Sequence, residues 1–430
     1  MKFELLHPAD QLVLIMDRIY QNGLTTTSGG NLSILDENGD IWITPSGIDK
    51  GTLTRGDICC VKAADKSVVG ANKPSVELPI HSSVYERRPD IRAVLHAHPP
   101  GLVAFSTARV LPDINLVANA RRTLDSITMA DYAVPGSKKL GDNISKEFER
   151  GFNVVVMENH GVVIGADSLF DAYKKFETLE SLAKLEINAR KLGSAKSLEE
   201  SEVNLSSTRD HHLMDDFMPN KHTSEECAAR RDMTNLIRRS YRQKLFGSTQ
   251  GTYSMRLSDG SFLITPYGVD RAYMDESDLV LIKHGMKESG KVPSRSVKLH
   301  QTIYNQHSEI NSVLSANPPY AMAFAVTDIT FDPRTIPESY ILLRETKKIS
   351  YSSLYLEADK VSSLLSDRTP VLICENNQIL ATGNSLLHAF DRLEVMEATA
   401  HSIVLALDIC DLTHISDEQI KEIDKAFNLK

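Results

Sequence analysis

The sequence predicts an α/β protein that consists of two tandem copies of one fold. Three observations predict this. Stretches with helical periodicity alternate with short apolar runs typical of buried strands. Motifs from the first half return, in unchanged order, in the second half. A polar, charged stretch without sustained periodicity separates the halves at residues 193–224. With 430 residues, the chain is also too long for one ordinary domain.

The first elements follow from periodicity and turn chemistry. Residues 8–22 carry apolar side chains at helical spacing and run into Gly23, which predicts a helix. A small-residue loop at 25–34 leads into a strand. DENGD at 36–40 has the composition of a hairpin turn, and the strand 41–49 follows it.

Three further segments complete the first copy. Residues 79–87 are predicted to form a helix, with Pro79 in its first turn, where a missing N–H costs nothing. Val94–Pro100, VLHAHPP, is predicted to be a buried strand that its prolines end. Residues 151–166 read as two short strands around a polar turn, and 168–191 as a long amphipathic helix.

The repeat rests on four pairs of similar segments. They are 43–49 with 264–270, 81–85 with 300–304, 94–100 with 313–319, and 158–160 with 375–377. Four matches in the same order, with small drifts in spacing, indicate a tandem duplication. We therefore expect a first domain at 1–192, a linker at 193–224 and a degenerate second domain at 225–430.

Three histidines of the first copy suggest a metal site. His96 and His98 lie two apart in a predicted strand, so both would project from one face, and His160 lies at a strand–turn boundary. Three neutral imidazoles with an open position are typical of catalytic zinc sites. Glu77 is a candidate fourth ligand or acid/base. The second copy replaces all four while keeping neighbouring residues, as expected of one functional unit; the replacements are Ser315, Asn317, Asn377 and Ser296.

Small-residue turns of the first copy suggest an anion site. Such turns expose backbone N–H groups and hydroxyls, which suit phosphate, although each alone can be an ordinary tight turn. The candidates are Gly30, Asn31, Ser46, Gly47 and Ser75. The sequence contains no Walker A loop, GxGxxG or GxSxG motif, so nucleotide binding and serine hydrolysis are not predicted.

Composition excludes several partners. Lys and Arg number 48 against 57 Asp and Glu, without a basic run, so nucleic acid is not expected as a partner. The sequence shows neither a signal-peptide core nor an apolar run long enough to span a bilayer. Five cysteines without CxxC spacing indicate reduced thiols and a cytoplasmic location. His211, His212 and His222 are interpreted as solvated linker histidines, with a metal site as the alternative.

The motifs SGGNLS, ITPSGI, PSVE followed by His81, HAHPP and ENHG resemble, in order and approximate spacing, those of the class II aldolase/adducin family. That family includes L-fuculose-phosphate aldolase and L-ribulose-5-phosphate 4-epimerase. The resemblance covers residues 8–192 well and 225–412 more weakly. It implies three-layer α/β/α domains, each with a mixed, mainly antiparallel sheet.

The resemblance also implies a site. A divalent metal, usually zinc, would be held by His96, His98 and His160. Glu77 would ligate the resting metal and act as acid/base, while the small-residue turns would bind the substrate phosphate. Two residues depart from the family pattern: Val76 replaces the second serine of PSSE, and Leu116 stands about where fuculose-phosphate aldolase has a catalytic tyrosine.

The expected activity is that of a metal-dependent sugar-phosphate aldolase, a lyase that cleaves a ketose phosphate through a metal-stabilised enediolate. A ketopentose-phosphate 4-epimerase or a keto-acid-phosphate decarboxylase would use the same site. From another class, an adducin-like scaffold would lack a working metal site, which describes the second copy. The resemblance further implies a homo-oligomer.

Overall fold

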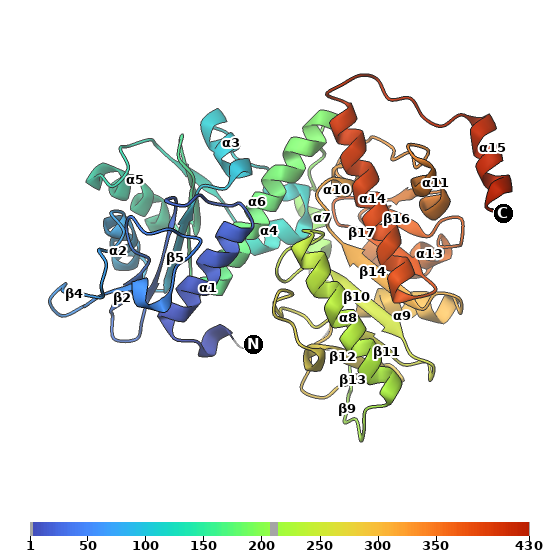
Figure 1. The fold of residues 1–430 in the computed structure, drawn as a ribbon, viewed down its shortest axis with the longest axis horizontal. Coiled ribbons are helices and arrows are strands. Elements are labelled where there is room, and N and C mark those ends of the chain that lie inside the picture. Colours follow the sequence, from blue (N-terminus) through green and yellow to red (C-terminus); the bar gives the residue numbers. More distant parts are fainter. Residues whose placement is uncertain (1–2, 207–213, 430) are drawn as a thin grey trace. The chain divides into compact units, whose positions relative to one another are not determined.

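The computed structural model describes residues 3–206 and 214–429. Their contacts divide the chain into two compact units, each with its own β-sheet (Figure 1). The N-terminal unit comprises residues 3–114 and 120–184. The C-terminal unit comprises residues 115–119 together with the described residues from 185 onward. The division falls inside the long helix α6, Leu169–Leu192.

The N-terminal unit contains an eight-stranded sheet of order β4-β3-β2-β1-β5-β8-β7-β6. β6 and β7 pair in parallel, and the other neighbours are antiparallel, so the sheet is mixed and mainly antiparallel, as predicted. Its strands are β1 Asn31–Leu35, β2 Ile41–Ile43, β3 Cys59–Val61, β4 Val68–Val69, β5 Ala93–Ala97, β6 Thr128–Ala130, β7 Val154–Met157 and β8 Val162–Ala166.

Helices cover both faces of this sheet (Figure 1). On one face α2 and α5 pack on strand residues such as Val94 and Val163 in one apolar core. On the other face lie α1 and α6, where the Arg18 guanidinium stands 4.5 Å from the Tyr173 ring centroid. The helices are α1 Pro8–Gln21, α2 Leu78–Arg87, α3 Pro100–Ala108, α4 Ala118–Leu124, α5 Lys138–Glu149 and α6.

The strand expected at 41–49 is shorter in the structure, because β2 ends at Ile43. Pro45 has no N–H for the ladder, and the chain there pairs with a loop segment instead. The Ser46 N–H donates to the Lys73 carbonyl (2.9 Å), and the Ser75 N–H donates to the Thr44 carbonyl (3.2 Å). The bend therefore places Ser46 and Gly47 beside Ser75.

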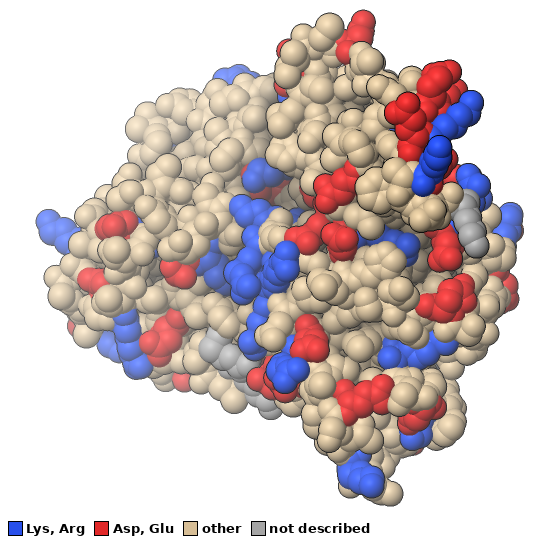
Figure 2. Space-filling view, turned by 45° about the vertical axis from the view of Figure 1, so that its right-hand side comes forward, with Lys and Arg blue, Asp and Glu red and all other residues tan. Residues whose placement is uncertain are grey.

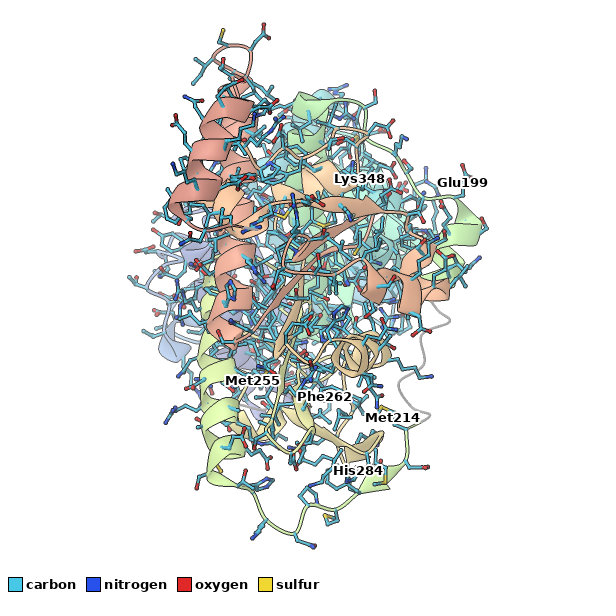
Figure 3. All side chains as sticks on the ribbon, turned by 90° about the vertical axis from the view of Figure 1, so that its right-hand side faces the viewer. Glu199, Met214, Met255, Phe262, His284 and Lys348 are labelled. Atoms are coloured by element: carbon cyan, nitrogen blue, oxygen red, sulfur yellow. The ribbon has the colours of Figure 1, made fainter. Side chains whose placement is uncertain are left out.

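The C-terminal unit repeats this plan in a nine-stranded sheet of order β15-β16-β17-β14-β10-β11-β12-β13-β9. Figure 3 labels His284, in the β12–β13 turn, and Lys348, on β15, near opposite ends of this sheet. Its strands are β9 Asp216–Phe217, β10 Thr252–Arg256, β11 Phe262–Ile264, β12 Val280–Lys283, β13 Met286–Glu288, β14 Ser312–Ala316, β15 Lys347–Ile349, β16 Val371–Cys374 and β17 Gln378–Gly383.

The helices of the C-terminal unit also flank its sheet. α9 and α13 share a core with one face, while α8 and α14 lie side by side, with Arg239 3.0 Å from the Glu394 carboxylate. The helices are α7 Glu200–Leu205, α8 Ser224–Arg242, α9 Val297–Gln306, α10 Ala321–Ala325, α11 Pro337–Leu343, α12 Ser353–Leu356, α13 Ala358–Ser363, α14 Leu386–Ala406 and α15 Asp417–Ala426.

The stretch predicted as a linker contains short elements. Helix α7 and strand β9 lie within it, and β9 pairs in parallel with β13. His211 and His212 lie outside the described residues. His222 precedes α8, and its Nδ1 is 2.9 Å from a Glu226 carboxylate oxygen, an ion-pair geometry that needs no metal.

Residues 115–119 belong to the C-terminal unit because that unit binds their backbone. The Asn376 side chain donates to the carbonyls of Leu116 (3.0 Å) and Lys196 (2.6 Å). Ala118 packs with Leu198 and Tyr351 in a small apolar cluster. Leu116 is therefore buried in the C-terminal unit, at 1% exposure.

No helix among the described residues is long and apolar enough to cross a membrane. On the face shown in Figure 2, acidic and basic side chains both occur, and neither charge covers the whole face. All five cysteines are free; Cys59, Cys60 and Cys374 are buried, whereas Cys227 and Cys410 are exposed.

One buried acid of the C-terminal unit should make its stability depend on pH. The Glu397 carboxylate accepts the N–H groups of Tyr320 (3.1 Å) and Ala321 (2.8 Å) before α10. Burial nevertheless raises the Glu397 pKa from 4.5 to about 7. The folded unit then holds this proton more tightly than the unfolded chain, so stability falls as pH rises through this interval.

We expect Glu397→Gln to gain stability relative to the wild type, by about 1–3 kcal/mol, as pH rises from 5 to 8. Chemical denaturation at several pH values measures this difference. Glu180→Gln is the matched control, because Glu180 accepts the N–H groups of Gly101 and Leu102 but has the Lys184 ammonium 3.0 Å away. A Glu397→Gln difference that stays constant with pH would contradict the prediction.

Candidate functional site

His96 lies in the middle of the N-terminal sheet, and its position fixes which ring nitrogen is free. It is on β5, opposite Asn31 of β1 and Val163 of β8, and is 2% exposed. Its Nδ1–H donates to the Val162 carbonyl (3.0 Å). The remaining nitrogen, Nε2, has no hydrogen-bond partner among the described residues. A backbone acceptor on the other ring nitrogen is the usual arrangement for a metal-ligating histidine.

His98 follows the end of β5, and two glycines make room for its ring. A Cβ atom at Gly29 would lie 3.0 Å from His98 Nδ1, and a Cβ at Gly161 would lie 2.7 Å from its Cδ2. His98 Nε2 is buried without a hydrogen-bond partner in the described part of the chain. Gly29 immediately precedes Gly30 and Asn31 of the predicted anion site, and in the structure it accommodates the His98 ring.

His160 is placed by the turn between β7 and β8. The residue before it, Asn159, has a φ of 52°, a left-handed conformation that asparagine tolerates better than most residues. The His160 N–H donates to Ser106 Oγ (3.0 Å), and Ser106 Oγ donates to the Met157 carbonyl (2.6 Å). Ser106 on α3 thereby fixes the turn that carries the third imidazole.

The three imidazoles form one cluster. Ring centroids are 4.6 Å apart for His96 and His98, 5.0 Å for His96 and His160, and 4.9 Å for His98 and His160. One nitrogen of each ring lies within 4.8 Å of the others. Burial, and then the neighbouring imidazoles, lower the pKa of His98 to about 3 and of His160 to about 4. Three imidazole nitrogens that converge in this way fit a divalent metal ion.

Glu77 lies against this cluster at the start of α2. Its Oε2 is 3.3 Å from His96 Nε2, and its Oε1 is 4.0 Å from His160 Nε2. Asn31 Nδ2 donates to Oε2 (2.7 Å). Burial of Glu77 opposes its charge, but the adjacent His96 and the Asn31 hydrogen bond lower its pKa on balance. Glu77 is therefore a carboxylate at neutral pH, next to the converging imidazoles.

The small-residue turns converge beside Glu77. Besides the hydrogen bonds of Ser46 and Ser75 given above, the Lys50 N–H donates to the Thr27 carbonyl (2.9 Å), which joins the 25–31 loop to the 44–50 loop. The Glu77 N–H donates to Ser75 Oγ (3.2 Å). Gly30 and Gly47 have φ of 72° and 70°, so both turns need glycine there. The Asn31 side chain, in contrast, is engaged by Glu77.

Sequence reasoning missed Lys50 and Thr25. Lys50 is 3% exposed, and its ammonium donates to the Pro45 carbonyl (2.6 Å), beneath the turn that holds Ser46 and Gly47. The pKa of Lys50 is lowered by burial. Thr25 Oγ1 is buried beside Gly30, without a partner among the described residues. The repeat could have indicated Lys50, because the second copy has another cation, Arg271, at the equivalent position of the sequence.

The equivalent residues of the second copy make a different network. Asn317 donates to the Asn377 carbonyl, and the Asn377 side chain donates to the Tyr355 hydroxyl (2.6 Å). Ser315 Oγ lies 3.5 Å from His300 Nε2. Ser296 occupies the N-cap position of α9, as Glu77 occupies that of α2. Amide and hydroxyl groups thus replace the converging imidazoles.

Comparison with known proteins relates both copies to one family. The family model described as Class II Aldolase and Adducin N-terminal domain matches residues 10–187 and again residues 231–404. The L-fuculose phosphate aldolase of Methanococcus maripaludis is 36% identical over 173 residues, which cover 40% of this chain and 89% of that protein.

Two other relatives carry different names. The 5-deoxy-D-ribulose 1-phosphate aldolase of Bacillus thuringiensis is 30% identical over 199 residues, covering 45% of this chain and 91% of that protein. The 3-oxo-tetronate 4-phosphate decarboxylase of Escherichia coli is 29% identical over 180 residues, covering 41% of this chain and 84% of that protein.

We expect His96→Ala and His160→Ala to abolish stoichiometric binding of a divalent metal, because each removes one of three converging nitrogens. Elemental analysis of protein purified after zinc loading measures this, and circular dichroism checks that the fold remains. Asn317→Ala is the matched control, since it truncates the equivalent of His98 in the second copy and should leave metal content unchanged. Full metal content in either histidine variant would refute the assignment.

Proposed function

Because the chain belongs to the class II aldolase and adducin family, we propose that it is a metal-dependent lyase that cleaves a phosphorylated ketose by a retro-aldol reaction. The observation that carries this proposal is the carboxylate of Glu77, 3.3 Å from a buried imidazole of a three-histidine cluster. A charged acid/base group next to a metal-type ligand set is the combination that such a reaction needs.

In this proposal His96, His98 and His160 hold the metal, and Glu77 completes the ligand set at rest. The three imidazoles and one carboxylate suit zinc, which we propose as the metal. When bound, such a cation acts as a Lewis acid that polarises the substrate carbonyl and stabilises the negative charge that develops beside it. His98 and His160 contribute by being neutral at physiological pH, because their lowered pKa values leave no proton to compete for their nitrogens.

The substrate phosphate is proposed to bind at the converging turns. The backbone N–H groups of Gly30 and Gly47 are proposed to donate to it, and Ser46 and Ser75 would add hydroxyls. Asn31 is proposed to contribute as well, as the sequence predicted. The buried ammonium of Lys50 lies beneath the Ser46 turn and adds a positive charge that favours an anion. These groups would orient the ketose with its carbonyl toward the histidines.

Glu77 is proposed to carry the proton. In retro-aldol cleavage the hydroxyl on the carbon β to the carbonyl loses its proton, the bond between the α and β carbons breaks, and an aldehyde leaves. The electron pair remains on the α side, delocalised onto the carbonyl oxygen, and the α carbon then takes a proton. Glu77, a carboxylate at neutral pH, lies where it can accept a proton and later return it.

Decarboxylation of a β-keto acid phosphate would use the same charge stabilisation. One relative is named as such a decarboxylase, so this reaction is the second candidate. Two of the three relatives above are named aldolases, which favours cleavage between two sugar carbons. A homo-oligomer and a cytoplasmic location remain predictions of the sequence.

The proposal is tested with the purified full chain, loaded with zinc, on ketose 1-phosphates and on keto-acid phosphates. We expect an aldehyde and a three-carbon keto phosphate from at least one ketose phosphate, measured by coupled assay and mass spectrometry. Release of carbon dioxide from a keto-acid phosphate alone would favour the second candidate. Failure to bind stoichiometric metal would instead favour an adducin-like scaffold.

We expect Glu77→Gln to keep its metal but lose turnover by about 10²–10⁴-fold, because removing a positioned acid/base commonly costs that much. Steady-state kinetics with the substrate identified above, together with metal analysis, separates the two effects. Ser296→Ala, which truncates the equivalent residue of the second copy, is the control and should keep wild-type kinetics. Near-wild-type turnover of Glu77→Gln would show that another residue performs the proton transfer.

A further inference from the structure

A chain of hydrogen bonds connects Glu77 to the core of the N-terminal unit. Asn31 Nδ2 is 2.7 Å from Glu77 Oε2, and Asn31 Oδ1 is 2.5 Å from His81 Nε2. His81 Nδ1 is 2.6 Å from Ser33 Oγ, which is 2.6 Å from the Tyr85 hydroxyl. All five residues are buried, with exposures between 0% and 8%. The chain spans β1 and α2 and ends at the proposed proton carrier.

The donor and acceptor roles along this hydrogen-bonded series follow from the Asn31 amide. Its nitrogen, which faces Glu77, can only donate, and its oxygen, which faces His81, can only accept. His81 Nε2–H therefore donates to Asn31, and Nδ1 accepts from the Ser33 hydroxyl. Ser33 in turn accepts from Tyr85. Burial lowers the pKa of His81 to about 3, which keeps the ring neutral. The Asn31 amide oxygen then selects the tautomer with the proton on Nε2.

The second copy keeps most of this series of hydrogen bonds, although it has Ser296 in place of Glu77. His300 Nδ1 is 2.7 Å from Ser254 Oγ, which is 2.6 Å from the Tyr304 hydroxyl, as in the first copy. Thr252 replaces Asn31, and its hydroxyl is hydrogen-bonded to Ser294 Oγ (2.6 Å). The His–Ser–Tyr part is thus common to both copies. The asparagine link occurs in the copy that has Glu77.

We propose that Asn31, held in orientation by His81, is a positioning residue that fixes the Glu77 carboxylate against the histidine cluster. The proposal rests on the proposed function, and it assigns Asn31 a role besides binding phosphate. Without the amide N–H, Oε2 of Glu77 loses its 2.7 Å donor, and the side chain can turn away from His96 and His160. Without His81, the amide loses the donor that keeps its nitrogen toward Glu77.

The test compares His81→Leu, His81→Gln and His300→Leu in the full chain. His81→Leu is expected to lower kcat about 10–100-fold with little change in KM, as is typical when a supporting hydrogen bond is removed from a metal site. His81→Gln should recover most of kcat, because its side-chain amide can donate to Asn31 Oδ1. His300→Leu removes the same ring from the second copy and should leave kcat unchanged.

A readout without substrate separates this inference from the proposed function. Competition with a zinc-binding dye should show affinity weakened about 10-fold in His81→Leu and in Asn31→Ala, and unchanged in His300→Leu. If the wild type cleaves no ketose phosphate, the proposed function fails while this comparison still decides the role of Asn31.

Two results would overturn the proposal. One is equal loss of kcat and zinc affinity in His81→Leu and His300→Leu, which would show a general effect of damage to the core. The other is an Asn31→Ala variant with raised KM but unchanged kcat and zinc affinity, which would leave Asn31 with phosphate binding alone. If His81→Leu does not fold, the Asn31→Ala variant tests the proposal by itself.

Discussion

The register of β5 between β1 and β8 is the constraint on which the site depends. β5 pairs antiparallel with both neighbours, so that His96 stands opposite Asn31 on one side and Val163 on the other. Side chains alternate between the faces of a strand, and a shift by one residue would turn His96 toward α1 and α6. The same register supplies the Val162 carbonyl that fixes the ring, and it places Asn31 where its amide meets Glu77. The pairing of the core strands therefore sets the relative positions of the site residues.

Comparing the two copies distinguishes the residues that the fold requires from those that the site requires. Both keep a buried cation under the turn after the second strand of the sheet: Lys50 donates to the Pro45 carbonyl and Arg271 to the Pro266 carbonyl. Both keep a buried histidine hydrogen-bonded to a serine, whose hydroxyl is in turn hydrogen-bonded to a tyrosine. These features persist without metal ligands, so the fold uses them in both copies, and in the first copy Lys50 and His81 are proposed to support the site as well. Asn31, Glu77 and the three histidines are absent together from the second copy, so they belong to the site.

Much of the fold could be predicted from the sequence, because periodicity and turn residues act locally. The helices at 8–22, 79–87 and 168–191 and the strand with His96 were confirmed within a few residues. The grouping of Glu77 with the histidines was also inferred, because the repeat showed four residues changing together. A lone buried histidine such as His81 gives no such signal, because its partners Asn31 and Ser33 lie about fifty residues away. The binding of Leu116 by Asn376 spans 260 positions and leaves no local pattern at all.

Asn376 bears on how the second copy has evolved. Its backbone has a φ of 50°, like that of Asn159 before the third histidine, so the second copy has the turn geometry that precedes a candidate ligand in the first. Its side chain, however, now fastens Leu116 and Lys196, and the neighbouring Asn377 is bonded to Tyr355. Imidazoles returned to positions 315, 317 and 377 would meet these new bonds, and Ser296 would still offer no carboxylate. A second metal centre in this copy would therefore need many simultaneous changes. Three imidazoles and a carboxylate would have to be introduced, and the hydrogen bonds that Asn376 and Asn377 make would have to be replaced.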